Sequence, residues 1–308
     1  MSSTRRAVLP VVERAGALLF YPTLYEGFEF SANCVYLGAA PNQNSVLLAD
    51  FATGVFGPRY YFVGSNYVFP YESNRIMRDL LVSRGGQVIE ERFVPLRPSP
   101  EDIDRVIGEL RRLSPDVVFS TVVGDGARAF YQAYDRAGFD RARMPVLSLT
   151  TGEPELAAMG GAAAEGHYTS APYFASIPTE ANRRFVAAYR AENGPAAPIS
   201  ACTEAAYFQV HLFAEAARRA GGVDRAALLA TLPTVEFAAP QGVVRIDGRT
   251  QHTFLHPRIG QANRAGGFDI VRESNGALRP DPYMVEPEAA GWGRFAAWSL
   301  LWLLLLTA

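Results

Sequence analysis

The chain contains no lysine, so all of its basic side chains are arginines. We interpret this bias as a feature of the coding sequence rather than of the function. The 29 basic and 31 acidic residues give a net charge of −2, which offers no electrostatic case for binding nucleic acid or an anionic membrane surface. The two cysteines, Cys34 and Cys202, are too few for a disulfide scaffold, and their spacing does not fit a zinc site. We expect two buried free thiols.

Sequence signatures of enzymes are also scarce. The chain has no GxSxG elbow and no P-loop, and Gly124-Asp125-Gly126 falls short of a dinucleotide-binding fingerprint. His252 and His256 have the i, i+4 spacing of metal ligands, but Pro257 and the surrounding strand pattern argue against a shared helix face. We therefore expect a protein without catalytic residues, metal or cofactor.

Strand and helix signals alternate in the first half of the chain. Apolar strands are predicted at 17–21, 60–63, 87–94, 116–121 and 145–148, with helices at 41–52, 71–84, 100–113 and 127–137 between them. Such strands favour a parallel sheet covered by helices on both faces. The signal then becomes helical at 179–192 and 201–220, and later gives short strands at 242–246, 254–259 and 268–271. This change of pattern predicts an α/β chain that crosses between two lobes.

Polar side chains gather in four turns that follow predicted strands. The turns are Tyr21-Pro22-Thr23, Ser65-Asn66-Tyr67, Gly124-Asp125-Gly126 and Thr150-Thr151-Gly152-Glu153. In a parallel sheet the carboxyl ends of the strands face the crevice where ligands bind. Hydroxyls, an amide and aromatic rings suit a small, uncharged, hydrogen-bonding ligand. Taken alone, each turn is better explained by ordinary turn and N-cap chemistry. Taken together, the four turns are explained equally well by a ligand site.

Both ends of the sequence depart from a regular α/β chain. The first residues lack the apolar segment of a signal peptide and start on a helical pattern, with Ser2 to Thr4 as N-cap candidates. We expect that a strand ahead of this helix is missing. Residues 295–308 are apolar throughout, but this stretch is shorter than the roughly 20 residues that span a bilayer. A weak tail anchor is one interpretation, and an ill-fitting extension or a change of reading frame is the favoured one.

Several segments resemble the type I periplasmic-binding-protein family. They are RRAVLPVVERAGALLFYPTLYEGFE, GAAPNQNS, VGSNYVFPYESN, VVFSTVVGDG, SLTTGEPE, EGHYTSAPYF, EAAY, APQGVVRI and RPDPY. Within that family they are most similar to the aliphatic-amide sensor AmiC and to the urea and short-chain-amide receptors of ABC transporters. The resemblance covers residues 2–286 in consistent order. It implies a two-lobed α/β fold with parallel sheets flanked by helices and a first lobe that is incomplete at the N-terminus.

The resemblance also divides the chain into parts. Residues 1–38 would be the remnant of lobe 1, 39–174 lobe 2, 175–243 the return to lobe 1, 244–286 the return to lobe 2, and 287–308 an apolar C-terminal tail. Members of the family have further β/α units ahead of the first helix. We therefore expect this chain to be truncated at its N-terminus.

Candidate ligand contacts follow from the matching motifs. They are Ser2, Tyr21, Thr23, Tyr67, Asp125 and Thr150, and Ser65 joins them from the same turn as Tyr67. The resemblance implies that Ser2 binds the amide oxygen, and a carboxylate such as Asp125 can accept from the amide NH2. The family often has Asp where this chain has Asn66, which weakens or redirects that acceptor.

The implied function is non-catalytic binding of a small neutral amide or urea in an interlobe cleft. One interpretation is a cytoplasmic amide sensor that represses amidase expression through a regulatory antiterminator protein. The alternative is a periplasmic receptor that delivers the solute to an ABC permease. A signal peptide would decide between the two, and we expect that the region carrying it is missing from this sequence. A homodimer is an option for either, and neither contacts nucleic acid directly. Two further hypotheses are an amidohydrolase, for which the sequence offers no activated nucleophile, and a non-functional fragment.

Overall fold

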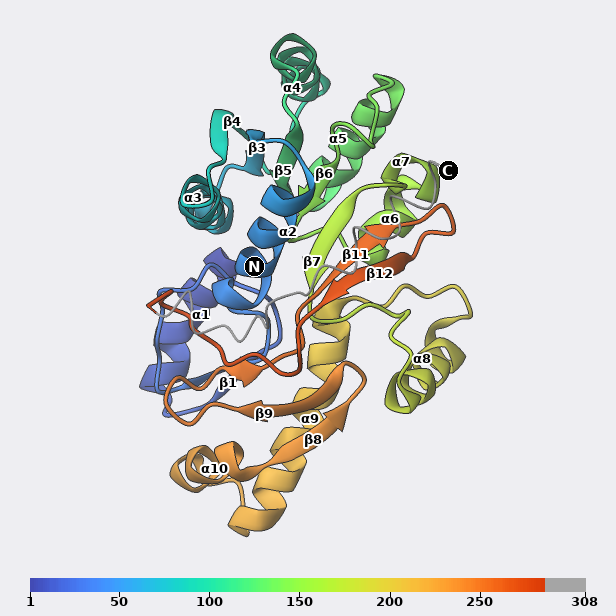
Figure 1. Ribbon diagram of the computed structural model, residues 1–308. Helices are drawn as coiled ribbons and strands as arrows, with labels where there is room; N and C mark the ends of the chain where they lie inside the picture. The colour runs from blue at the N-terminus through green and yellow to red at the C-terminus, as the bar shows by residue number, and fades with distance from the viewer. Residues whose placement is uncertain (286–308) are drawn as a thin grey trace.

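The computed structural model describes residues 1–285 of the chain as two lobes. A larger lobe holds a seven-stranded sheet, and a smaller lobe holds the first helix, two short sheets and the long helix α9 (Ala201–Ala220) (Figure 1). The predicted two-lobed α/β architecture is confirmed. The predicted apolar tail at 287–308 lies outside the described residues. No helix within residues 1–285 has the length and apolar character to cross a bilayer.

The sheet of the larger lobe is mostly parallel, as its apolar strands predicted. Its spatial order is β12 (Phe268–Glu273), β11 (Arg258–Ala262), β7 (Tyr168–Ala171), β6 (Val146–Ser148), β5 (Val117–Thr121), β3 (Arg59–Ser65) and β4 (Gln87–Val94). Strands β3 to β7 are parallel, whereas β11 is antiparallel to both β7 and β12. The strand order reverses between β3 and β5, and a crevice at such a switch point is a usual ligand position in open α/β sheets.

Helices cover both faces of this sheet because residues alternate along each strand. The odd-numbered Tyr61 and Val63 of β3 pack against α4 (Pro100–Leu113), α5 (Asp125–Arg136) and α6 (Glu153–Met159). The neighbouring Tyr60 and Phe62 pack on the opposite face, against α2 (Leu47–Val55) and α3 (Val68–Val82). Each face buries its own apolar core, which holds the carboxyl ends of the strands in place.

The smaller lobe combines short strands with helices. Its strands are β1 (Leu19–Tyr21) and β2 (Cys34–Tyr36), which are parallel, and β8 (Glu236–Ala239), β9 (Gly242–Ile246) and β10 (Thr253–Phe254), which form an antiparallel sheet. A parallel bridge between Tyr36 and His252 joins the two sheets. Helix α9 and helix α10 (Arg225–Thr231) cover them, with Phe208 and Leu212 fully buried in the core. Helix α1 (Ser2–Arg14) packs beside β1, and α8 (Glu180–Asn193) lies along β8.

Three segments connect the lobes, at 37–41 between β2 and the next helix, at 172–179 after β7, and at 255–257 before β11. The first of them enters a buried π-helical turn, Asn42–Val46, which hydrogen-bonds to residues close to the other two segments and to Leu278. Gln43 Nε2 donates to the carbonyls of Thr253 and Leu278, both at 2.9 Å. Ser170 Oγ donates to the Asn44 carbonyl at 2.9 Å. The connection between the lobes is therefore a packed polar junction.

The structure corrects several predicted elements. The predicted strand at 254–259 is two strands, β10 and β11, which lie in different sheets. The predicted helix at 41–52 begins as the π-helical turn, and strands β2, β7 and β8 and helices α7 (Gly161–Ala164) and α10 were missed. Strands β9 and β10 pair within the smaller lobe, and β11 is the first strand after them that joins the large sheet. Strand pairing therefore favours a return of the chain to the larger lobe after Phe254. The four lobe boundaries inferred from the resemblance stay a prediction.

Candidate functional site

Two of the candidate contacts hold the loop that follows β5. Ser65, at the end of β3, accepts a hydrogen bond at its Oγ from the Val123 N–H at 3.2 Å. Thr150, after β6, donates from Oγ1 to the Val122 carbonyl at 3.1 Å. Both side chains are therefore partly committed to building the edge of the larger lobe at the switch point.

Three other candidates meet around one buried carboxylate from the smaller lobe. Ser2 begins α1 and donates its hydroxyl to the carboxylate of Glu26. Tyr21 is only 8% exposed, and its hydroxyl has no hydrogen-bond partner among the described residues. Burial raises the pKa of Tyr67, at the start of α3 in the larger lobe, and the nearby charge of Glu26 and the Tyr21 hydroxyl raise it further. Glu26 thus bonds to Ser2, and its charge acts on Tyr21 and, from the smaller lobe, on Tyr67 of the larger lobe.

Thr23 lies beside a cysteine that sequence reasoning did not assign to the site. Burial raises the pKa of the Cys202 thiol, while hydrogen bonds with the Thr23 side chain and the Leu24 backbone lower it. The thiol is also close enough to Tyr21 to raise the pKa of that phenol. Thr23 and Cys202 therefore lie on the side of Tyr21 and extend the group of candidate contacts.

Asp125 is the candidate that the structure keeps apart. Its side chain is 84% exposed at the first turn of α5, and it pairs with Arg128 at 3.2 Å. No described contact joins it to the other candidates. Its predicted role as acceptor for an amide NH2 stays a prediction.

The cation beside Ser2 and Tyr21 is fully occupied. Arg5 is 2% exposed and bonds to Glu26 at 3.1 Å and to Glu29 at 2.7 Å. Its guanidinium also lies over the rings of Tyr21 and Tyr25, at 5.0 and 4.7 Å from their centroids. A ligand carboxylate would therefore have to compete with two carboxylates that are already in place.

A small cavity lies between the lobes next to these residues. Its volume is about 40 Å³. Its polar lining consists of Asn44, Ser170, Cys202 and Gln241, and the rest is apolar: Pro22, Leu24, Leu37, Gly38, Ala39, Leu149, Ala171, Pro172, Ala201 and Ala205. No described lining residue carries a charge. Since about 10–15 Å³ is enough for one water, the cavity has room for roughly three to four non-hydrogen atoms.

The polar residues of this cavity were missed at their individual positions. Asn44, Ser170 and Gln241 lie within the segments GAAPNQNS, EGHYTSAPYF and APQGVVRI, which carried the family resemblance. That resemblance was the available signal, but nothing local to each residue points to a cavity. Cys202 was correctly expected to be free, and it is partly buried.

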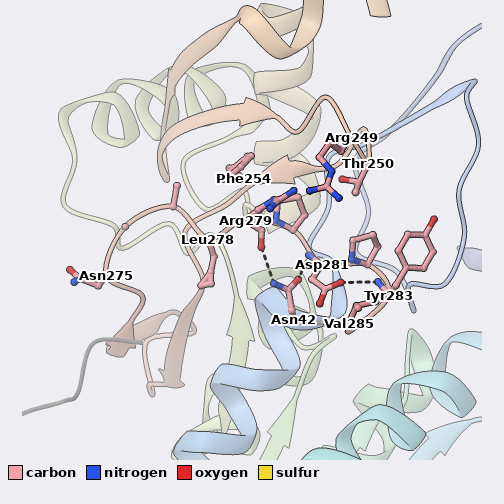
Figure 2. Close-up of a pocket in the computed structure, with 14 residues that line it drawn as sticks. Asn42, Arg249, Thr250, Phe254, Asn275, Leu278, Arg279, Asp281, Tyr283 and Val285 are labelled. Atoms are coloured by element: carbon pink, nitrogen blue, oxygen red, sulfur yellow. Dashed lines mark hydrogen bonds between the residues drawn. The ribbon is translucent and has the colours of Figure 1, made fainter. Parts of the chain in front are cut away.

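A larger groove of about 550 Å³ lies elsewhere, along the segment 275–285 (Figure 2). The Asn42 side chain anchors this segment by donating to the Arg279 carbonyl at 2.9 Å and accepting from the Asp281 N–H at 2.8 Å. Arg279 in turn pairs with Asp247 at 3.0 Å. The groove contains none of the candidate contacts, so its size alone does not make it the functional site.

The histidines do not form a metal centre. Among residues 1–285, no group of three or more metal-binding side chains is assembled. His252 stacks on Tyr36 at 4.2 Å and bonds to the Tyr25 hydroxyl at 2.5 Å, and burial lowers its pKa to about 4. His256 bonds instead to the Val243 carbonyl at 2.9 Å. The i, i+4 pair is therefore split between two structural roles.

Comparison with known proteins gives a family match over nearly the whole chain. A family described as periplasmic binding protein domain matches residues 1–289. A curated protein named limonene hydroxylase, from Geobacillus stearothermophilus, is 33% identical over 126 residues, which is 41% of this chain. The chain spans only 23% of the length of that protein.

Solved structures share the fold at low identity. A solute-binding protein of an ABC transporter from Rhodopseudomonas palustris BisB5, in complex with 3,4-dihydroxybenzoic acid, is 22% identical with a TM-score of 0.78, over 89% of this chain and 76% of its own. A counterpart from Rhodopseudomonas palustris HaA2, in complex with p-hydroxybenzoic acid, is 20% identical with a TM-score of 0.78, over 91% and 77% of the two chains. An amino acid ABC transporter substrate-binding protein from Pseudomonas fluorescens Pf-5 is 19% identical with a TM-score of 0.76, over 94% and 78%.

Proposed function

The chain belongs to the periplasmic binding protein family, and we propose that it binds a short neutral amide or urea between its lobes without transforming it. In this proposal the interlobe cavity receives the solute and the group formed by Ser2, Tyr21, Thr23 and Tyr67 closes over it. A ligand that binds one arrangement of the two lobes better than another would convert occupancy of the cavity into a change of shape.

The observation that carries the proposal is the size and neutrality of the interlobe cavity. With room for roughly three to four non-hydrogen atoms, it matches acetamide or urea far better than a hydroxybenzoate. Hydroxyl, thiol and amide groups in the lining can donate or accept hydrogen bonds without an ionic partner. The hydroxyl of Tyr21, which is buried without a partner, supplies one further group whose desolvation a ligand would compensate.

The partner we propose is an ABC permease. The structural matches reported above are solute-binding proteins of ABC transporters, and this supports a receptor ahead of the amide sensor that the sequence favoured. Both interpretations share the binding step and differ in the partner, a permease for the receptor and an antiterminator for the sensor. No contact in residues 1–285 favours the antiterminator.

Thermal unfolding of the full chain with millimolar acetamide, urea, acetate or 4-hydroxybenzoate tests the ligand. A ligand at 100 times its dissociation constant stabilises the folded state by about 2.7 kcal/mol. We expect acetamide or urea to raise the unfolding midpoint and 4-hydroxybenzoate to leave it unchanged. A rise with 4-hydroxybenzoate and none with the two neutral solutes would refute the proposal.

A pair of substitutions at Cys202 locates the binding. Cys202→Leu fills the cavity and is expected to remove the acetamide-dependent rise, whereas Cys202→Ser keeps the volume and is expected to retain it. The midpoints of both variants without ligand show whether either change disturbs the fold. Equal responses of the two variants to acetamide would place the ligand elsewhere.

A further inference from the structure

The hydroxyl of Ser2 already has an acceptor, and this fixes what it can offer to a ligand. It donates to Glu26 Oε2, and Glu26 is 2% exposed. The other oxygen of the same carboxylate accepts from Arg5 Nη2 at 3.1 Å. A serine whose proton is committed to a carboxylate can only accept from a third group.

The surroundings of Glu26 keep this arrangement rigid. Arg5 also holds Glu29, whose Oε1 accepts from Arg5 Nε at 2.7 Å and from the Tyr36 hydroxyl at 3.0 Å. Arg6 lies 3.8 Å from Glu29, so two arginines and two glutamates form a cluster with no net charge. Burial alone would lower the pKa of Arg5, but its bonds to the two glutamates raise it, and the guanidinium stays charged.

Arg5 cannot turn toward the cleft to accept an anion. Its guanidinium lies over the rings of Tyr21 and Tyr25, and its side chain is fully buried. Its contact with Ser2 Oγ is long, at 3.4 Å, and leaves that oxygen an open acceptor position. The Ser2 oxygen is therefore an acceptor backed by a carboxylate for a ligand group that reaches it.

We propose that Glu26, positioned by Arg5, sets Ser2 as a hydrogen-bond acceptor and so selects ligands that present an N–H group and rejects carboxylates. This inference rests on the proposed function and reverses the polarity that the family resemblance implied for Ser2. Glu26 is the specificity-determining residue, and Arg5 is a positioning residue that acts through it.

Acetamide and acetate are the probes, because they have the same shape and differ only in NH2 against O−. Titration calorimetry of the wild-type chain is expected to show at least about tenfold tighter binding of acetamide, the ratio that one mispaired hydrogen bond gives. In Glu26→Gln, the new amide oxygen stays with Arg5 and its NH2 faces Ser2, which frees the serine proton for donation. We expect this variant to reduce the preference for acetamide by at least about tenfold.

Glu29→Gln is the matched control, since it removes the same charge from the same cluster without touching Ser2. It is expected to keep the ratio of acetamide to acetate affinity. Ser2→Ala removes the acceptor and leaves the pair of Arg5 and Glu26 intact, and it is expected to weaken acetamide by about tenfold without a gain for acetate.

The outcomes separate this inference from the proposed function. Acetamide binding with a ratio that Glu26→Gln leaves unchanged would overturn the inference and leave the function standing. If Glu26→Gln does not fold, full acetamide affinity in Ser2→Ala overturns it instead. A wild-type chain that binds neither acetamide nor urea refutes the function and the inference together.

Discussion

Raising the pH from about 4.5 to about 8 is expected to destabilise the protein through Glu204, a carboxyl buried where the lobes join. Glu204 is fully buried on α9, and burial raises its pKa to about 8. Its oxygens accept from the Gln241 backbone at 3.3 Å and from the Gln241 side chain at 2.7 Å. These hydrogen bonds, and the charge of Arg258, lower the pKa but do not offset the burial.

The sign follows from the proton count of the two states. Between its ordinary pKa of 4.5 and about 8, Glu204 holds a proton in the folded state and releases it on unfolding. The stabilisation is therefore complete below pH 4.5 and is lost as the pH rises through 8. One such group changes the free energy of unfolding by about 1.4 kcal/mol per pH unit inside this window.

Guanidinium chloride unfolding of wild type and Glu204→Gln at pH 5, 6 and 7 measures this slope. The wild-type free energy of unfolding is expected to fall more steeply than that of Glu204→Gln, by about 1.4 kcal/mol per pH unit. Glu153, whose pKa burial raises to about 7, contributes equally to both proteins and cancels. Glu215→Gln, on the exposed side of the same helix, is the control and should follow the wild-type slope. Parallel lines for wild type and Glu204→Gln would refute the reasoning.

Two further predictions use pairs of matched variants. Tyr21→Phe removes a buried hydroxyl without a partner, so the free energy of unfolding of the unliganded protein should rise by about 1 kcal/mol while acetamide binding weakens about tenfold. The hydroxyl of Tyr60 is equally unpaired but lies in the core of the larger lobe, so Tyr60→Phe should gain stability with no change in acetamide affinity. An equal loss of affinity in both variants would show that Tyr21 does not contact the ligand. In the second pair, a Cβ at Gly38 would lie 2.1 Å from the Thr23 carbonyl carbon, whereas a Cβ at Gly108 on α4 meets open space. Chemical unfolding should therefore show a loss of about 3 kcal/mol or more for Gly38→Ala and a gain of about 1 kcal/mol for Gly108→Ala, and a mild effect at Gly38 would contradict the close approach.

The first and last residues of several elements with strong local signals were predicted correctly from the sequence. Helix α4 begins where Ser99 and Asp102 form a reciprocal capping box, and α9 ends where Gly221 adopts the left-handed conformation. Strands β4 and β9 were also placed correctly. Both contain β-branched and other apolar residues that favour strands, and glycine or proline on either side marks where each run stops.

Elements that depend on distant partners were not predictable in the same way. The π-helical turn at Asn42–Val46 is stabilised by carbonyls more than 200 residues away, such as that of Thr253. The segment 254–259 reads as one strand locally, but its two ends pair with different sheets. The candidate contacts were obtained from family motifs, whereas the cavity lining requires knowing which segments meet between the lobes.

The cavity and the junction of the lobes share a residue, and this links binding to lobe geometry. Gln241 lines the cavity, and it also binds Glu204 and accepts from the His256 N–H at 3.1 Å. Arg258 donates to the carbonyls of Pro172, His256 and Gln241 at 2.8, 2.9 and 2.9 Å. One guanidinium therefore bonds to two of the three segments that connect the lobes and to the turn between β8 and β9 at Gln241. A solute that contacts Gln241 therefore meets the residue on which the arrangement of these segments depends. Because a ligand shifts a conformational equilibrium only through contacts that differ between the two states, this shared position is where occupancy of the cavity can change the relation of the lobes.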